Sequence, residues 1–153
     1  MLLGEFGYSD SDLFYDSFGK PYLKDGKHIS ISHSYNFSTI VISSIEVGID
    51  IEKQRSKIIK IAPKFVGYET FYLNKNDPSQ IKKLTWVWCT KEALYKLYGT
   101  PGINFKKHFM VLPFSTESNN TIAWIVRGHH KLKFIATFVE FEGFGCVITE
   151  PEI

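Results

Sequence analysis

Three acidic side chains, placed in two segments of the sequence, have the spacing of a cation site. Asp50 and Glu52 lie two residues apart in a β-branched run, so both carboxylates project from one face of a strand. Glu92 lies in a separate, helical segment. Three carboxylates match the oxygen ligands that Mg²⁺ prefers, with water and phosphate oxygens completing its octahedron. An isolated Asp-x-Glu would indicate only a solvent-facing strand end, so the prediction depends on Glu92 as well.

Glu92 also lies four residues before Lys96, on the same face of the predicted helix. Such a pair is often an exposed ion pair that contributes only a few tenths of a kcal/mol. Trp88 stands one turn before Glu92 on that face, which favours partial burial. A carboxylate and an ammonium in a half-apolar setting suit a site that holds a metal ion together with phosphates.

Predicted strands must position the first two carboxylates. Residues 28–34 alternate, with Ile29 and Ile31 on one parity and serines on the other, which is typical of a half-buried strand. The β-branched runs 39–43 and 46–52 are joined by a short polar link and are predicted to pair with each other.

Predicted helices follow. Residues 57–65 favour a short helix that Pro63 interrupts or kinks. A longer helix is predicted over 79–98, with Asp77 as its N-cap and Gly99 as its stop signal. Cys89 falls inside that helix, where we expect a reduced, buried thiol.

Strands return in the last third of the chain, and their runs, with turns at Gly128 and Gly143, are 121–126, 132–139 and 145–148. Strands, helices and strands again predict an α+β fold in which an antiparallel sheet packs against one long helix and a shorter helix. The chain reads as a single domain over 1–153, with a connector-like segment over 1–27.

Composition narrows the class of protein. The net charge of +2 does not call for a nucleic-acid partner, and no nucleic-acid-binding pattern accompanies the pI of about 8.4. Two cysteines make no disulfide framework, and no apolar run is long enough for a membrane span. Met1 to Leu3 are cut short by Gly4 and Glu5, so no signal peptide is predicted. A cytoplasmic location is the expectation.

Four motifs occur together in this chain, and they are Gly19-Lys-Pro-Tyr22, Ile31-Ser-His-Ser34, Val47-Gly-Ile-Asp-Ile-Glu52 and Trp88-Cys-Thr-Lys-Glu-Ala-Leu-Tyr-Lys96. Their order and spacing resemble those of the 4′-phosphopantetheinyl transferase superfamily. The first two motifs resemble the surfactin-synthetase-activating type. The resemblance covers about residues 15–105 strongly, and it implies the half-fold of that family.

By position, the resemblance implies that Asp50, Glu52 and Glu92 are magnesium ligands. It implies that Lys96 contacts the pyrophosphate of coenzyme A. It further implies that Glu69 is the general base for the carrier serine, although a water held by the metal ion is an equal alternative.

The resemblance also implies that Lys20 and His33 surround the 3′-phosphate of coenzyme A, with Ser32 beside it. From the residues alone, Lys20 would be a turn lysine and His33 a satisfied core or strand-end histidine. The implied reaction transfers 4′-phosphopantetheine from coenzyme A to a serine of an acyl or peptidyl carrier protein and releases 3′,5′-ADP, as in fatty-acid biosynthesis. Such phosphoryl transfer needs positioning and charge neutralisation more than covalent help.

Basic residues crowd the segment after Glu52, and they are Lys53, Arg55, Lys57, Lys60 and Lys64. They form either a solvated helix face or a surface that steers an acidic carrier protein to the site.

The chain departs from the surfactin type, because most of an N-terminal half has no counterpart in it. Two explanations are open: the chain is an N-terminally shortened form, or self-association replaces the missing half. For the function, the alternative to the transferase is a catalytically incomplete homologue that only binds coenzyme A and metal, or a carrier protein.

Overall fold

The structure is a computed structural model that describes residues 2–153, and it is built on two antiparallel sheets. Sheet A has the strand order β1-β2-β3-β4, and its strands are β1 (Leu13–Tyr15), β2 (Pro21–Leu23), β3 (His28–Ser34) and β4 (Phe37–Ser43). Sheet B has the order β5-β9-β8-β7-β6, and its strands are β5 (Gly48–Lys53), β6 (Phe109–Val111), β7 (Asn120–Arg127), β8 (His130–Phe141) and β9 (Phe144–Pro151). The predicted α+β class with antiparallel pairing is confirmed.

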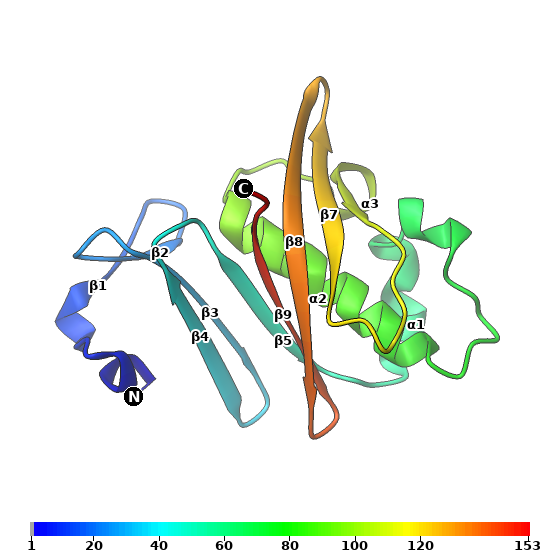
Figure 1. Cartoon of the computed structure of the whole chain (residues 1–153), viewed down its shortest axis with the longest axis horizontal. Coiled ribbons are helices and arrows are strands. Elements are labelled where there is room, and N and C mark those ends of the chain that lie inside the picture. The colour runs from blue at the N-terminus through cyan, green and yellow to red at the C-terminus, as the bar shows by residue number, and fades with distance from the viewer. Residues whose placement is uncertain (1) are drawn as a thin grey trace.

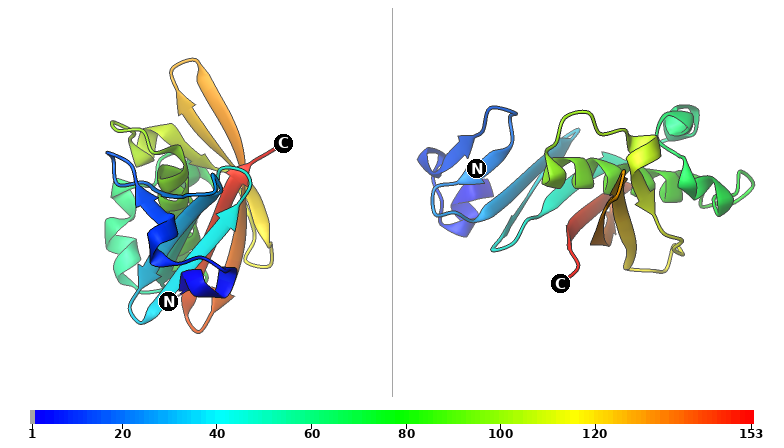
Figure 2. Two further views of the ribbon diagram at one scale, coloured as in Figure 1. Left: turned by 90° about the vertical axis from the view of Figure 1, so that its left-hand side faces the viewer. Right: turned by 90° about the horizontal axis from the view of Figure 1, so that it is seen from above.

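The helices lie on one face of sheet B, and the long helix crosses β5 and β9 (Figures 1 and 2). They are α1 (Lys57–Ile61), α2 (Gln80–Tyr98) and α3 (Phe105–His108), with the 3-10 turns η3 (Ala62–Lys64) and η4 (Tyr68–Phe71). Two further 3-10 turns, η1 (Leu2–Phe6) and η2 (Asp10–Asp12), lie at the N-terminal end beside sheet A (Figure 1). Within residues 2–153, none of these helices has the length and apolar content needed to cross a membrane.

The predicted pairing of the runs 39–43 and 46–52 is wrong. β4 pairs with β3 in sheet A, whereas β5 pairs with β9 in sheet B, where Asp50 stands opposite Val147. Two β-branched runs with a short link favour a local hairpin. Here β5 joins sheet B instead, and the hydrophobic burial of its Ile49 and Ile51 in an apolar cluster with residues of β9 stabilises that pairing.

The segment expected to be connector-like is part of the sheet instead. Residues 13–23 form β1 and β2, which extend sheet A beyond β3. Leu3 and Leu23 are buried with Ile29 in one apolar cluster beneath that sheet. Short strands of this kind show weak periodicity, and the sequence pattern therefore missed them.

The helix predictions hold within a few residues. α1 ends at Ile61, and a 3-10 turn that contains Pro63 follows it. α2 has Ser79, and not Asp77, at its N-cap position, while Gly99 at its C-terminal end adopts a φ of 62°. The Asp77 carboxylate instead accepts from the Ser79 N–H and pairs with Lys83. Cys89 is buried in α2 as a free thiol, as expected.

The closest approach of α2 to sheet B occurs at Gly48 of β5. A Cβ atom added at Gly48 would lie 2.0 Å from the Ala93 carbonyl oxygen. Only glycine permits this approach, because any larger residue would push the helix backbone away. Gly48 therefore sets the spacing between the carboxylates of β5 and the side chains of α2.

Candidate active site

The two carboxylates of β5 lie on one face of the strand, as their spacing predicted, and that face packs against α2. Gly48, Asp50 and Glu52 share the helix-facing side of the strand, while Ile49 and Ile51 pack on its other side. The Asp50 residue is 4% exposed, and Glu52 is half-buried at the strand end. Burial raises the pKa of Asp50, and it raises the pKa of Glu52 with help from the Asp50 charge.

Asp50 is held by one of its two oxygens. Its Oδ1 accepts a hydrogen bond of 3.0 Å from the Ser32 hydroxyl and another of 3.0 Å from the Lys96 ammonium. Its Oδ2 is buried and has no hydrogen-bond partner among the described residues. A buried carboxylate oxygen without a partner costs about 1–3 kcal/mol or more, so a water molecule or an ion is expected to bind it. The Cys89 thiol also lies near the Asp50 carboxyl and acts to lower its pKa.

Glu92 lies beside this pair on the half-buried face of α2. Burial raises its pKa to about 7, and the charges of Asp50 and then Glu52 add to the rise, while Lys96 opposes it. The three acidic groups therefore act on one another electrostatically. They are not drawn into a closed cluster, because residues 2–153 contain no preformed group of three His, Cys, Asp or Glu side chains at metal-binding distances.

Lys96 connects Asp50 to a neighbouring cavity. Its ammonium donates to the Ile49 carbonyl oxygen at 3.0 Å as well as to Asp50. It also lines a cavity of about 210 Å³ together with Lys20, whose own ammonium donates to the Leu97 carbonyl oxygen at 2.7 Å. The structure thus brings Lys20 and Lys96 to one cavity beside Asp50.

The remaining sheet A residues separate onto two faces of β3. Ser32 is 5% exposed and points at β5, whereas His33 is exposed on the opposite face. The strand predicted over 28–34 is present as β3, but it is buried on more than its isoleucine parity: Ser30 and Ser32 are buried as well as Ile29, and Ile31 is half-buried. The serines are buried because β5 crosses that face and uses their hydroxyl groups as hydrogen-bond acceptors.

Glu69 lies apart from this group, in η4. It is fully buried, and one of its oxygens is 2.5 Å from the Lys91 ammonium. Its other oxygen accepts from the Val111 N–H at 3.2 Å. As folded, Glu69 has no surface from which to take a proton from a substrate, so the geometry does not support the role of general base.

Lys91 is the residue that the sequence reasoning missed. It is fully buried, and its ammonium also donates to the carbonyl oxygens of Phe65 at 2.6 Å and Phe105 at 3.0 Å. Burial lowers its pKa, which the charge of Glu69 opposes. A signal was present, because Lys91 interrupts the apolar helical stripe of Leu84, Val87 and Leu94.

Trp88 closes the side of the site next to Glu52. Its indole N–H donates to a Glu52 oxygen at 3.4 Å, and its ring packs between those of Phe65 and Phe105 at centroid distances of 5.0 and 5.6 Å. The predicted partial burial of this helical face is confirmed, since Trp88 and Glu92 are both half-buried.

A basic surface borders the same region. The segment 53–75 carries six exposed cationic side chains, and they are Lys53, Arg55, Lys57, Lys60, Lys64 and Lys75. Its one acidic residue, Glu69, is buried against Lys91. An apolar groove of about 550 Å³ runs beside α1, and it is lined by Ile59, Ala62, Val66 and Leu84 among others, with Lys75 and Lys106 at its edges.

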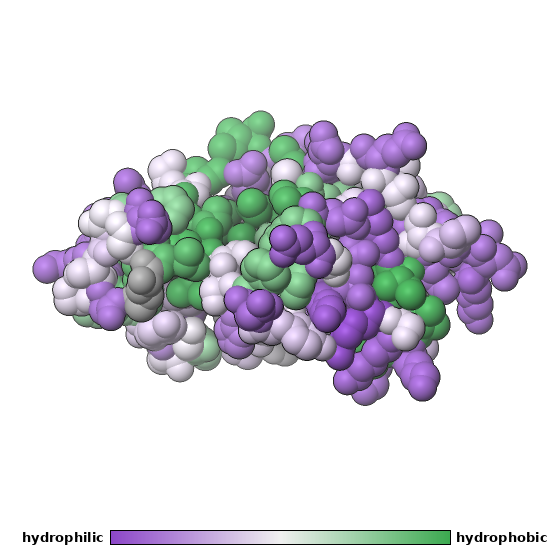
Figure 3. All heavy atoms as spheres, turned by 90° about the horizontal axis from the view of Figure 1, so that it is seen from below, coloured by the Kyte–Doolittle hydropathy of each residue, from purple (hydrophilic) through white to green (hydrophobic). Residues whose placement is uncertain are grey.

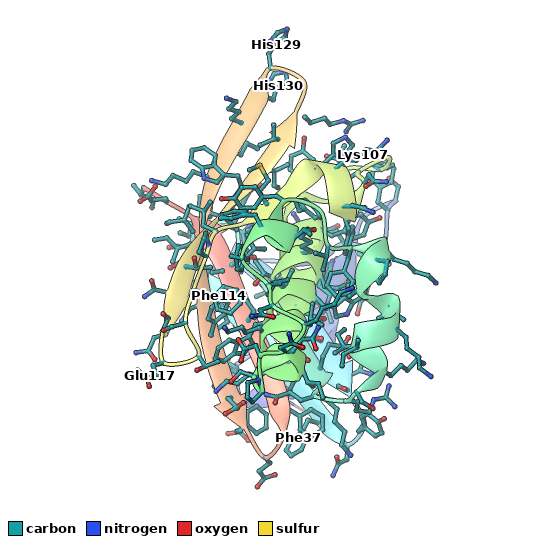
Figure 4. All side chains as sticks on the ribbon, turned by 90° about the vertical axis from the view of Figure 1, so that its right-hand side faces the viewer. Phe37, Lys107, Phe114, Glu117, His129 and His130 are labelled. Atoms are coloured by element: carbon teal, nitrogen blue, oxygen red, sulfur yellow. The ribbon has the colours of Figure 1, made fainter. Side chains whose placement is uncertain are left out.

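Figure 3 shows a small hydrophobic patch surrounded by hydrophilic side chains at the end of the molecule that carries α1. His129 and His130 lie far from the site, at the tip of the β7–β8 hairpin and away from α2 (Figure 4). The same view shows Phe114 between sheet B and the helix, where it packs against Trp86 and Phe138.

Comparison with known proteins agrees with this arrangement. A family model described as the 4′-phosphopantetheinyl transferase superfamily matches residues 46–143. The chain is 30% identical over 135 residues to the 4′-phosphopantetheinyl transferase gsp of Aneurinibacillus migulanus, covering 86% of this chain and 54% of that protein. It is 33% identical over 87 residues to a 4′-phosphopantetheinyl transferase of Bacillus subtilis, covering 54% of this chain and 38% of that protein.

The chain thus spans about half the length, or less, of the curated relatives that it matches. The matched segment contains β5, α2 and all three acidic residues of the site. Because the family model matches more than half of the chain, this chain belongs to the 4′-phosphopantetheinyl transferase superfamily.

Proposed function

We propose that this chain transfers 4′-phosphopantetheine from coenzyme A to a serine of an acidic acyl or peptidyl carrier protein, in a Mg²⁺-dependent reaction. The observation that carries the proposal is the buried, unpartnered Oδ2 of Asp50, next to two further carboxylates and two lysines. The family and the relatives' names support the reaction class.

The residues present fit a magnesium ion. Asp50, Glu52 and Glu92 supply only oxygen donors, and their mutual repulsion is what a divalent cation relieves. Glu52 and Glu92 are half-buried, so their side chains keep freedom to turn toward a cation. When bound, the ion would neutralise charge on the pyrophosphate during transfer.

The two lysines suit the phosphates of coenzyme A. Lys96 places a positive charge between the carboxylates and the cavity that it shares with Lys20. In the reaction the serine oxygen bonds to the β-phosphorus of coenzyme A, the bond from that phosphorus to the bridging oxygen breaks, and 3′,5′-ADP leaves. Lys96 would stabilise the charge that grows on the leaving oxygen. The serine proton would pass to a water molecule, because Glu69 is buried against Lys91.

The basic surface suits the carrier protein. An exposed face with six cations and no exposed acid attracts a negatively charged partner. The apolar groove beside α1, with lysines at its edges, can take apolar side chains of an acidic helix. We therefore place the carrier protein across α1 and the groove, next to Glu52.

A direct test is the mass of an apo carrier protein after incubation with coenzyme A and Mg²⁺. We expect the mass of one phosphopantetheine group to be added with the wild type and none with Asp50→Ala, which removes a metal ligand. A panel of carrier proteins from fatty-acid, polyketide and peptide synthesis identifies the substrate. An unmodified carrier with every member would contradict the proposal.

The alternative is a homologue that binds coenzyme A, metal or a carrier protein without turnover. Wild-type protein that binds coenzyme A in a calorimeter but leaves every carrier unmodified would support it.

A second copy of the chain is a further expectation. Aromatic side chains of the β1–β2 hairpin are 42–71% exposed beside the Lys20 cavity, and they are Phe14, Tyr15, Phe18 and Tyr22. We expect a second copy to cover this patch, so that specific activity rises with protein concentration as light scattering reports association. A monomer with full specific activity would contradict this expectation.

A further inference from the structure

The exposed edge of β5 is satisfied by two serines of β3 instead of a neighbouring strand. β5 is the edge strand of sheet B, so the N–H groups on its outer side have no strand partner. The Ile49 N–H donates to the Ser30 hydroxyl at 3.0 Å, and the Ile51 N–H donates to the Ser32 hydroxyl at 3.1 Å. Buried backbone donors require partners, so the two serines join sheet A to sheet B.

The two serines differ in where their own hydroxyl hydrogens go. The Ser32 hydroxyl donates to Asp50 Oδ1 at 3.0 Å, whereas the Ser30 hydroxyl does not bond to a site carboxylate among the described residues. A serine hydroxyl has one hydrogen, so the donor capacity of Ser32 is fully used by Asp50. Ser32 is also 5% exposed. It is therefore not placed to donate to a phosphate of coenzyme A, the position that the resemblance implied.

The bond from Ser32 determines which Asp50 oxygen stays free. Oδ1 accepts from both Ser32 and Lys96, and Oδ2 is left buried without a partner. Lys96 is 29% exposed at its side chain and flexible, whereas Ser32 sits on a strand that is tied to β5 by the Ile51 bond. The short Ser32 side chain thus restricts rotation of the Asp50 carboxylate more firmly than Lys96 does.

We propose that Ser32 is a positioning residue of the magnesium site, which binds Asp50 Oδ1 so that Oδ2 is presented to the metal ion. The inference rests on the proposed function, because it assumes that Asp50 binds a metal. Groups that orient a ligand in this way typically contribute about 10–100-fold to metal affinity when they are removed by mutation.

The matched variants are Ser32→Ala and Ser30→Ala. Each removes one acceptor of a β5 N–H, but only Ser32→Ala also removes the bond to Asp50. We expect both to lower the melting temperature of the metal-free protein by a similar amount. We expect Ser32→Ala alone to weaken Mg²⁺ binding, by about tenfold or more, as measured by calorimetry without coenzyme A.

A kinetic measurement separates metal positioning from phosphate binding. With Ser32→Ala, the Mg²⁺ concentration for half-maximal activity should rise while the KM for coenzyme A stays unchanged. If the KM for coenzyme A rises and Mg²⁺ binding does not weaken, Ser32 contacts the phosphate and the inference is wrong. Should Ser32→Ala fail to fold, Ser32→Cys keeps the volume with a much weaker donor, and the same pattern is expected.

The outcomes distinguish the two levels of the proposal. Equal Mg²⁺ affinity of the wild type and Ser32→Ala would overturn the inference and leave the proposed function standing. Equal weakening of Mg²⁺ binding by Ser30→Ala and Ser32→Ala would also overturn the inference, because the cause would then be the lost hydrogen bond to β5 that both variants share. Absence of Mg²⁺ binding by the wild type would contradict both the inference on Ser32 and the proposed function.

Discussion

At the scale of single residues, the site is a group of acids held in a setting that disfavours their charges. Burial raises the pKa of Asp50, Glu52 and Glu92, and only Lys96 among the contacting residues supplies a full positive charge. The proposed magnesium ion would favour the ionised form of these carboxylates, because an opposite charge lowers the pKa of an acid. The charges of these residues make the metal-free protein sensitive to pH.

The pH dependence of stability follows from Glu92. Its folded pKa of about 7 lies above the ordinary value of 4.5, so between these values the folded state binds a proton that the unfolded state has released. The free energy of unfolding of the metal-free protein should therefore fall as pH rises from about 4.5 to 7. Urea unfolding in the presence of a chelator measures this free energy at each pH. With Glu92→Gln, the free energy of unfolding should change less between pH 4.5 and 7. An identical pH profile for the variant would refute the assignment.

Glu69 and Lys91 show how a role predicted for one residue changes once its partner is known. Removing one member of a buried ion pair typically costs about 3–5 kcal/mol, because the other charge is left unpaired. We expect Glu69→Gln to lose stability of that order in urea unfolding, and Lys91→Met to do the same. The double variant should lose less than the sum. A stable Glu69→Gln protein that lacks only turnover would instead support a general base.

At the scale of elements, the packing of α2 on β5 sets the geometry of the site. Asp50 and Glu52 lie on the strand, while Glu92, Lys96 and Trp88 lie on the helix. Neither element has a complete site. Their separation depends on the contact of Gly48 with the backbone at Ala93, where no side chain fits.

Gly48→Ala tests this contact. Its Cβ would stand 2.0 Å from the Ala93 carbonyl oxygen, so the helix must shift, and overpacking of this kind costs about 1–3 kcal/mol or more. We expect a large drop in melting temperature and weaker Mg²⁺ binding. Gly4→Ala is the control, because nothing lies within 4 Å of its added Cβ. Equal stability of the two variants would mean that α2 and β5 are less closely packed.

At the scale of the whole molecule, charge is distributed unevenly. The net charge is only +2, yet every exposed charged side chain over 53–75 is positive. A small net charge therefore does not exclude a charged docking face, because acids elsewhere in the chain offset it. The face lies next to Glu52, at the end of β5 that the proposed carrier serine would approach.

Charge reversal on α1 should act on the carrier protein and not on coenzyme A. We expect Lys57→Glu and Lys60→Glu to raise the KM for the carrier several-fold, with little change in the KM for coenzyme A, and the effect should shrink at high salt. Lys131→Glu on the β7–β8 hairpin changes the charge equally and is the control. Equal effects of all three variants on the carrier KM would reject the docking face.

Local pattern alone was enough to place the acids of this protein. The two-residue spacing of Asp50 and Glu52 and the four-residue spacing of Glu92 and Lys96 follow from the periods of a strand and a helix. The C-terminal ends of α1 and α2 were also predictable, because Pro63 and Gly99 limit the helix through the backbone next to them. These features depend on neighbours in the sequence.

Only the tertiary structure decided which face of β3 is buried, which strand β5 joins and what Glu69 does. Each depends on a partner far along the chain: β9 for β5, Lys91 for Glu69, and the Ile51 N–H for Ser32. A serine that alternates with isoleucine indicates a solvent-facing position unless an edge strand needs its hydroxyl. The sequence therefore determined the acids of the proposed metal site, and the packing of β3 on β5 determined how Asp50 is held.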